Sequence, residues 1–261
     1  MCENMYDMII VGSGPAGLTA GIYGKRAGLK VVILESGFIQ GGQIVNTYEV
    51  DNYPGMPGIS GLELAEKLKE HVTGLGVEIA RGKVKGISLD GEWKIVHTKK
   101  ADYRGKAVIL AAGAVHRKFE VPGEEELAGM GVSYCATCDA NFFTDLEVYV
   151  AGGGDAAVEE ALYLTKFARK VTIIHRRDEL RAAKSIQEKA FKNPKLFFMW
   201  DSVVEELEGD DILQAMYVKN VKTGEVTKVE ADPEDGMFGL FGFIGTVPNT
   251  KIFEGIIDMD E

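Results

Sequence analysis

The stretch MIIVGSGPAGLTAGIYGKRAGLKVVILE, residues 8–35, predicts the fold of the first part of this chain. A short apolar run at 8–11 has the length of a buried strand, and the turn GSGPAG at 12–17 follows it directly. A helix is expected over about 15–27 and a second strand over 30–34. Strand, glycine turn, helix and strand in this order indicate a Rossmann-like βαβ unit.

The glycine turn and the acid after the second strand indicate what this unit binds. Gly12, Gly14 and Gly17 have the G-x-G-x-x-G spacing, which lets backbone N–H groups approach a pyrophosphate at the start of a helix. Glu35 stands at the tip of the second strand, where a carboxylate can accept hydrogen bonds from ribose hydroxyls. The unit is therefore predicted to bind a dinucleotide with free ribose hydroxyls, and a fortuitous glycine turn is the alternative.

The same pattern returns in LEVYVAGGGDAAVEEALYLTKFARKVTIIHRR, residues 146–177. A strand is expected over 146–151, the turn places Gly152, Gly154 and Ala157 at the motif spacing, and a strand over 170–174 follows a helix that reaches about residue 167. The chain therefore carries two nucleotide folds of one design.

The second unit ends differently from the first. After its second strand come His175, Arg176 and Arg177, with Arg181 a few residues further on, and no acid. Guanidinium groups can hold a 2′-phosphate through paired hydrogen bonds, whereas a carboxylate would repel it. The second unit is therefore predicted to bind NADPH; a solvated basic patch at a helix start is the alternative reading.

A dithiol lies between the two units, in SYCATCDANF at 133–142. The Cys135-x-x-Cys138 spacing favours a redox pair, because this spacing often lowers the pKa of one thiol. A zinc site would need a second ligand pair, and a purely structural disulfide is the other alternative. Asp139 is placed to exchange protons with the thiols, or to cap a helix, or both. Two dinucleotide sites and a dithiol together predict an electron relay from NADPH through a flavin to a disulfide.

Composition excludes other classes of function. The chain has 261 residues, 46% of them apolar, which suffices for one large or two ordinary domains. Its net charge of −11 argues against a nucleic-acid partner. No apolar run reaches the ~20 residues of a membrane span, and the N-terminus has no basic leader, so a cytoplasmic protein without membrane contact is expected.

The motifs GSGPAG, GGQ, VDNYPG, CATCD, GGGDAAVEEALYL and HRRDELRA, in this order, resemble those of the low-molecular-weight thioredoxin reductases of bacteria. The resemblance covers essentially the whole chain. It implies an NADPH-dependent, FAD-containing thioredoxin-disulfide reductase that works as a homodimer. It also implies that Cys138 is the thiol nearer the flavin, that Cys135 attacks thioredoxin, and that Asp139 is the acid of the exchange.

The predicted cofactor contacts combine the two motifs with what the resemblance implies. At the flavin site they are Gly12, Ser13, Gly14, Pro15, Ala16, Gly17, Glu35, Gly41, Gly42, Gln43, Asn52, Val84 (through its backbone), Ala112 and Gly113. At the NADPH site they are Gly152, Gly154, Asp155, Ala156, His175, Arg176, Arg177, Arg181, Ile244 and Gly245. The family often has Asn where this chain has Asp155, and no metal site is predicted.

The expected fold class is α/β, with two Rossmann-like FAD/NAD(P)-binding domains. Each carries a small antiparallel β excursion, at 76–114 with an Asp90-Gly91 hairpin signal and at 213–245. Residues 1–115 plus 246–261 are expected to form a discontinuous FAD-binding domain, and 116–245 the NADPH-binding domain with the cysteine pair.

The chain ends at IFEGIIDMDE, whereas family members usually continue with a Gly-Asp motif at the flavin and a helix at the dimer contact. On the resemblance, the C-terminal part of the first domain is therefore expected to be missing. The alternative functions are a flavin-deficient nucleotide-binding protein without activity, or a related reductase with another electron donor or acceptor. An intact second glycine turn and the arginine cluster argue against a ferredoxin donor.

Overall fold

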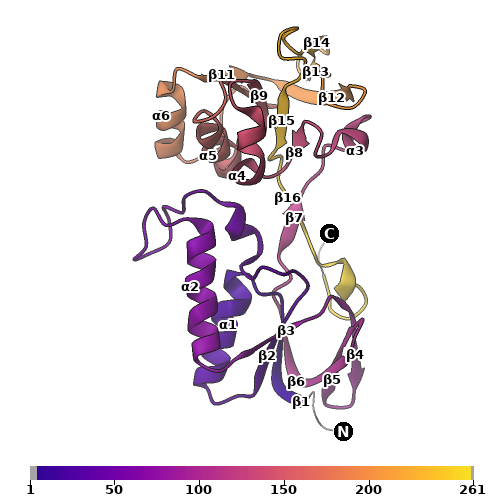
Figure 1. The fold of residues 1–261 in the computed structure, drawn as a ribbon. Coiled ribbons are helices and arrows are strands. Elements are labelled where there is room, and N and C mark those ends of the chain that lie inside the picture. Colours follow the sequence, from indigo (N-terminus) through magenta and orange to yellow (C-terminus); the bar gives the residue numbers. More distant parts are fainter. Residues whose placement is uncertain (1–4, 260–261) are drawn as a thin grey trace. The chain divides into compact units, whose positions relative to one another are not determined.

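The computed structural model describes residues 5–259 and divides the chain into two compact units (Figure 1). Unit 1 contains the residues up to Val115 together with those from Pro248 onward, and unit 2 runs from His116 to Val247. Each unit has its own sheet and its own hydrophobic core, and the two are described separately.

Unit 1 is built on a six-stranded sheet in the order β3-β2-β1-β6-β5-β4. The first four strands of this order pair in parallel, and β6, β5 and β4 pair antiparallel. The helices α1 and α2 and the 3₁₀ turn η1 connect the parallel strands. The bounds are β1 Met5–Val11, α1 Pro15–Arg26, β2 Val31–Glu35, η1 Gly42–Asn46, α2 Gly61–Gly74, β3 Glu78–Arg81, β4 Val84–Asp90, β5 Trp93–Thr98 and β6 Asp102–Leu110.

The two faces of this sheet are covered by different elements. Helices α1 and α2 cover one face, because α2 presents Leu64, Leu68 and Val72 at helical spacing toward the strands. The other face packs on β4 and β5 and on Phe253, which belongs to the short turn η3, Lys251–Phe253, and is 2% exposed. Phe253 thus anchors the turn η3 to the core of unit 1.

Unit 2 has a five-stranded parallel sheet in the order β11-β10-β9-β15-β8 and a separate antiparallel sheet of β12, β13 and β14. Its bounds are α3 Glu124–Leu127, β8 Val132–Ser133, α4 Ala136–Asp139, η2 Ala140–Phe143, β9 Glu147–Ala151, α5 Asp155–Leu164, β10 Lys170–Ile174, α6 Lys184–Lys192, β11 Leu196–Met199, β12 Ser202–Glu208, β13 Ala215–Asn220, β14 Val226–Glu230 and β15 Gly239–Gly242. The expected α/β class with an antiparallel excursion in each half is confirmed.

The cores explain this layering in unit 2. Val158, Ala161 and Leu164 of α5 pack with α6 and one face of the parallel strands, while the antiparallel strands cover the other face through Leu207, Met216 and Val218. Helix α5 ends at Leu164, before the expected residue 167. The amides of Lys166 and Phe167 donate to carbonyls three residues back, each at 3.0 Å, so the chain continues as a tightened turn.

The chain passes between the units twice, and the two passages pair. Strands β7, Ala114–His116, and β16, Thr246–Pro248, form a two-stranded sheet. The unit boundaries lie within these two strands. A paired crossing of this kind allows one domain to be inserted into another, and the domain functions assigned from the sequence stay a prediction.

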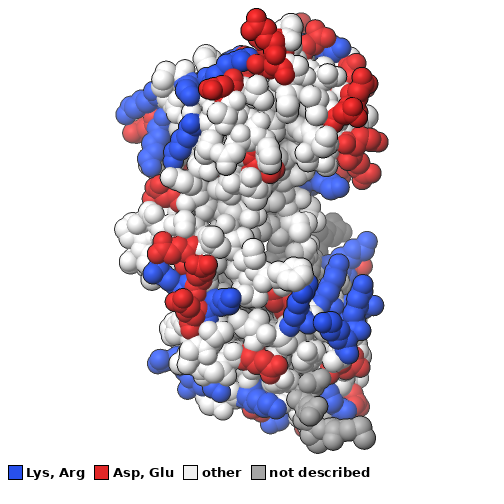
Figure 2. Space-filling view, in the orientation of Figure 1, with Lys and Arg blue, Asp and Glu red and all other residues white. Residues whose placement is uncertain are grey.

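Charged side chains are unevenly spread over the face shown in Figure 2, where acidic side chains gather over α3 and β12 of unit 2. Glu124–Glu126 and Glu205, Glu206 and Glu208 lie on these two elements. None of the helices in the described range 5–259 has the length and apolar character needed to cross a membrane.

Candidate functional site

The first glycine turn lies at the carboxyl end of β1, where α1 begins. Gly12 has φ +103°, and a Cβ there would overlap the carbonyl oxygen of Ala111 at the end of the neighbouring strand β6. At Gly14 a Cβ would meet only the carbonyl oxygen of Gly41, 3.9 Å away. The first glycine thus allows the tight turn, and the second leaves room for a ligand beside the N-terminus of α1.

Glu35 is held against this turn. Its Oε2 accepts hydrogen bonds from the Ser13 amide at 3.0 Å and the Ser13 hydroxyl at 2.6 Å. Its Oε1 accepts from the Gly37 amide at 2.7 Å and the Ser36 hydroxyl at 3.2 Å. Burial raises the pKa of Glu35, but the bonds from Gly37, Ser13 and Ser36 outweigh it and lower the pKa overall. The carboxylate is therefore charged and oriented at the strand tip.

The structure brings several other predicted flavin contacts to this turn. The Gly41 amide donates to the Ser13 carbonyl at 2.9 Å, and Gly42 lies beside Gly14. The Gln43 side chain donates to the carbonyl of Ala114. Asn249 donates to the carbonyls of Ala112 and Gly113 at 3.0 and 2.9 Å.

Two predicted contacts of this site have a different setting. The Val84 side chain is buried in the core of unit 1, which leaves its backbone as the group to meet a ligand. Asn52 lies in a bend between the bridged residues Val50 and Ile59. Open space at Gly14, the N-terminus of α1 and an ionised carboxylate fit an adenine dinucleotide with free ribose hydroxyls.

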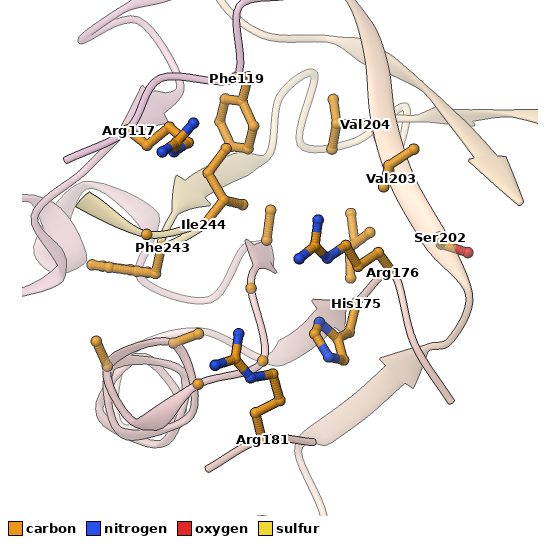
Figure 3. Close-up of a pocket in the computed structure, with 18 of the residues that line it drawn as sticks. Arg117, Phe119, His175, Arg176, Arg181, Ser202, Val203, Val204, Phe243 and Ile244 are labelled. Atoms are coloured by element: carbon orange, nitrogen blue, oxygen red, sulfur yellow. The ribbon is translucent and has the colours of Figure 1, made fainter. Parts of the chain in front are cut away.

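The second glycine turn opens into a pocket of about 830 Å³ within unit 2 (Figure 3). Gly152 has φ +144°, and a Cβ there would overlap the carbonyl oxygen of Phe243. Gly154 has open space where its Cβ would point. The turn, the end of β10, the start of β12 and the predicted contacts Ile244 and Gly245 line the pocket. A nucleotide would lie here at the carboxyl ends of parallel strands.

His175 is buried at the floor of this pocket. Its side chain is 6% exposed, and its ring packs on Gly153, where a Cβ would overlap the imidazole. Its Nε2 has no hydrogen-bond partner, which is unusual for a buried ring nitrogen. Burial lowers the pKa of His175, and the charges of Arg177 and Arg176 lower it further. The neutral ring thus leaves one nitrogen for a ligand, which supports the fit of a nucleotide.

Guanidinium groups approach the pocket from two segments. Arg176 and Arg181, two of the predicted NADPH contacts, line it, and Figure 3 shows their guanidinium groups directed toward the open space. Arg177 is not among the lining residues. Arg117, together with Phe119, lines the pocket from the segment that enters unit 2, and the sequence reading missed both. The sequence signal that could have found Arg117 is its position as a basic residue directly after the strand β7 that crosses between the units.

The cysteine pair is also in unit 2. Cys135 and Cys138 form a disulfide with a Cα–Cα distance of 5.3 Å at the start of the short helix α4. Cys135 is the N-cap residue of α4, and its sulfur accepts a hydrogen bond from the Cys138 amide at 3.3 Å. Such a donor would stabilise a thiolate at Cys135 once the disulfide is reduced.

Asp139 follows the disulfide and is tied to it through Ser133. The Ser133 hydroxyl donates to Oδ2 of Asp139 at 2.6 Å and accepts from the Cys135 amide at 3.1 Å. Asp139 stands at the N-cap position of η2, but its side chain makes no cap hydrogen bond there. Its carboxylate is therefore coupled to the cysteine segment instead. Ser133 was missed because nothing in its sequence position sets it apart.

Comparison with known proteins agrees with this arrangement of two glycine turns and a disulfide. The sequence model of the family described as pyridine nucleotide-disulphide oxidoreductase matches residues 6–260. A thioredoxin reductase of Peptoclostridium acidaminophilum is 56% identical over 99% of this chain and 82% of its own length. A thioredoxin reductase of Bacillus subtilis (strain 168) is 47% identical over 97% of this chain and 78% of its own.

A solved structure agrees with these sequence matches. The crystal structure of Lactococcus lactis thioredoxin reductase in its FR conformation has a TM-score of 0.92 and 50% sequence identity, covering 97% of this chain and 82% of that one. The chain belongs to the pyridine nucleotide-disulphide oxidoreductase family and, within it, to the bacterial thioredoxin reductases. Membership implies the use of a flavin and a nicotinamide nucleotide.

Proposed function

We propose that this protein uses NADPH and bound FAD to reduce the disulfide of thioredoxin. The observation that carries the proposal is the Cys135–Cys138 disulfide, which lies in the same unit as a pocket lined by arginines. A dithiol needs a source of electrons, and a pocket of this design in the same unit is suited to a nicotinamide nucleotide. The thioredoxin reductases with which it aligns act on thioredoxin by name.

Unit 1 would hold the FAD. Amides at the start of α1 would bind its pyrophosphate beside Gly14, and Glu35 would bind a ribose hydroxyl. The Ser36 hydroxyl makes the longest bond to Glu35, at 3.2 Å, so it is the donor a ribose hydroxyl would replace most easily. When bound, FAD would supply the two-electron carrier that a nicotinamide nucleotide and a disulfide need between them.

Unit 2 would bind NADPH through the groups of its pocket. Amides at the start of α5 would face the pyrophosphate, as they do in other glycine turns of this type. Arg176 and Arg181 would pair with the 2′-phosphate, and Nε2 of His175 would take a polar partner from the nucleotide. Arg117 would add a third positive charge at the pocket rim.

The two cysteines divide the exchange with thioredoxin. In the reduced protein, the Cys135 thiolate would attack one sulfur of the thioredoxin disulfide, forming a mixed disulfide and releasing the other sulfur as a thiolate. The Cys138 thiolate would then attack Cys135, which restores the Cys135–Cys138 disulfide and frees the second thioredoxin sulfur. Asp139 would hold or deliver the protons that the leaving thiolates take up.

The proposal extends to the setting of the reaction. Cycling of a dithiol is characteristic of the reducing cytoplasm, so the protein is assigned there. The resemblance to bacterial thioredoxin reductases also implies a homodimer. Light scattering of the purified chain measures its molar mass in solution and so its oligomeric state. A mass of one chain, 28.4 kDa, at micromolar concentration would count against the dimer.

The deciding experiment is an absorbance spectrum of the purified chain after incubation with FAD and removal of unbound FAD by gel filtration, before and after anaerobic NADPH. Flavin bands that bleach, followed by reduction of a thioredoxin disulfide, are the expected result. Flavin bands that NADPH leaves unchanged would exclude NADPH as the donor. A chain that stays colourless with FAD but binds NADP⁺ would be a nucleotide-binding protein without the relay.

A further inference from the structure

The segment that carries the pocket arginines, residues 175–183 between β10 and α6, is here called the arginine loop. Its first half is tied to the strand β12 side of the pocket. The His175 amide donates to the Met199 carbonyl at 2.9 Å, and the His175 carbonyl accepts from the Ser202 amide at 2.8 Å. The carbonyl of Arg177 accepts from the Asp201 amide at 3.2 Å.

The second half of the arginine loop is tied to the glycine turn. The amides of Arg181 and Ala182 both donate to the Gly153 carbonyl, at 2.7 and 3.2 Å. The next amide, that of Ala183, donates to Oδ1 of Asp155 at 2.7 Å. The arginine loop is therefore hydrogen-bonded to residues 199–202 at one end and to the glycine turn at the other. Asp155 supplies the side-chain hydrogen bond at the glycine turn.

Asp155 stands where its charge matters for an anionic ligand. It is the first residue of α5, it lines the pocket with Arg176 and Arg181, and it is exposed. A carboxylate at this point would repel the pyrophosphate of a nucleotide bound at the N-terminus of α5. A residue whose charge opposes the ligand needs another reason to be there, and the bond to Ala183 supplies one.

We propose that Asp155 is a positioning residue, whose carboxylate holds the arginine loop on the glycine turn so that Arg181 and Arg176 stay directed at a 2′-phosphate. The role rests on the proposed binding of NADPH. It also divides the side chain into two opposed effects. The acceptor oxygen favours the 2′-phosphate by ordering the loop, and the negative charge disfavours every nucleotide anion.

Two substitutions separate these effects. Asp155→Asn removes the charge and keeps an oxygen that can accept from the Ala183 amide, whereas Asp155→Ala removes both. Because both variants lack the charge, the difference between them reports the hydrogen bond alone. Asp155 is exposed, so both variants are expected to fold.

The binding experiment titrates the full chain with adenosine 2′,5′-bisphosphate in a calorimeter, in the presence of saturating FAD to occupy the nucleotide site of unit 1. The matched ligand that lacks the 2′-phosphate is 5′-AMP. Asp155→Asn should bind the bisphosphate a few times more tightly than the unsubstituted protein at low salt. Asp155→Ala should bind it about threefold to tenfold more weakly than Asp155→Asn, the range of one hydrogen bond. For 5′-AMP the two variants should agree within about twofold.

Amide hydrogen exchange without nucleotide tests the same role independently. Asp155→Ala should lose protection at 180–184, and Asp155→Asn should keep it, while β9 stays protected in both. Equal protection and equal bisphosphate affinity in the two variants would overturn the positioning role. If the unsubstituted protein binds 5′-AMP and the bisphosphate equally, the proposed NADPH preference fails instead, and the exchange result still decides whether Asp155 holds the loop.

Discussion

The two glycine turns of this chain share a backbone design and differ at the tip of the following strand. At Gly12 and at Gly152 a Cβ would overlap a carbonyl oxygen of a neighbouring segment, and two residues later the backbone faces open space in both turns. Glu35 of the first turn accepts four hydrogen bonds from its own surroundings. His175 of the second turn is buried with Nε2 unpaired.

This difference separates what a glycine turn does from what the strand tip does. The turn supplies amides and space for a pyrophosphate, which every dinucleotide has. The tip sets the charge that the rest of the nucleotide meets: an ionised carboxylate in unit 1, and a neutral imidazole followed by guanidinium groups in unit 2. We therefore expect any preference for a ribose hydroxyl or a 2′-phosphate to reside in a few residues after the second strand.

The largest effect should come from the dithiol and should spare both turns. Cys138→Ser removes the sulfur that closes the exchange, so reduction of thioredoxin should fall by about a thousandfold or more. Flavin absorbance and calorimetric binding of NADP⁺ should stay unchanged in the same preparation. Loss of either would mean that Cys138 also supports a nucleotide site. Asp139→Asn should cost less, about a hundredfold, the lower end of what a positioned acid or base contributes.

Substitution of the first glycine in each turn should act on one unit only. Gly12→Ala should destabilise unit 1 and abolish flavin retention, whereas Gly152→Ala should abolish NADP⁺ binding and leave flavin bound. Each combines a positive φ with a backbone overlap and should cost more than about 3 kcal/mol. The matched controls Gly76→Ala and Gly224→Ala share a positive φ without any atom in the way, so about 1 kcal/mol is expected.

Urea unfolding and the flavin spectrum measure these outcomes. If Gly152→Ala released the flavin, the two turns would not act independently. If the controls lost as much unfolding free energy as the turn variants, the backbone overlap would not be the cause.

Removing the pocket arginines should erase the preference of the second turn. The double variant Arg176→Ala, Arg181→Ala should weaken NADPH binding by about tenfold to a hundredfold and leave NADH nearly unchanged, because only NADPH has the 2′-phosphate. Arg177→Ala is the control, since its side chain does not line the pocket. Steady-state KM values for the two nucleotides test this. If Arg177→Ala had as large an effect as the double variant, the 2′-phosphate would have to be assigned to a site that includes Arg177.

The smallest effect should appear as pH falls. The pKa of His175 is below its ordinary 6.5, chiefly through burial, so its contribution to stability is present above pH 6.5 and is lost as the pH falls through the folded pKa. The pKa of Glu35 is below its ordinary 4.5, so the same loss begins only below pH 4.5. The second turn should therefore weaken at a higher pH than the first.

Urea unfolding between about pH 5 and pH 7 tests this order. His175→Asn should flatten the decline in that range, whereas His71→Asn, at an exposed position of α2, should not. An unchanged slope in His175→Asn would show that another group carries the pH dependence.

The sequence alone was sufficient for both turns, the dithiol, the fold class and the family. These features are local: a glycine spacing, an apolar run and a strand-tip residue all lie within about 30 residues, and their meaning comes from backbone sterics and charge. Only the tertiary structure showed that Arg117 lines the pocket, that Ser133 joins Asp139 to Cys135, and that Asp155 bonds Ala183, 28 residues away. Most of these partners lie on separate elements, and folding alone decides which polar groups meet at hydrogen-bond distance.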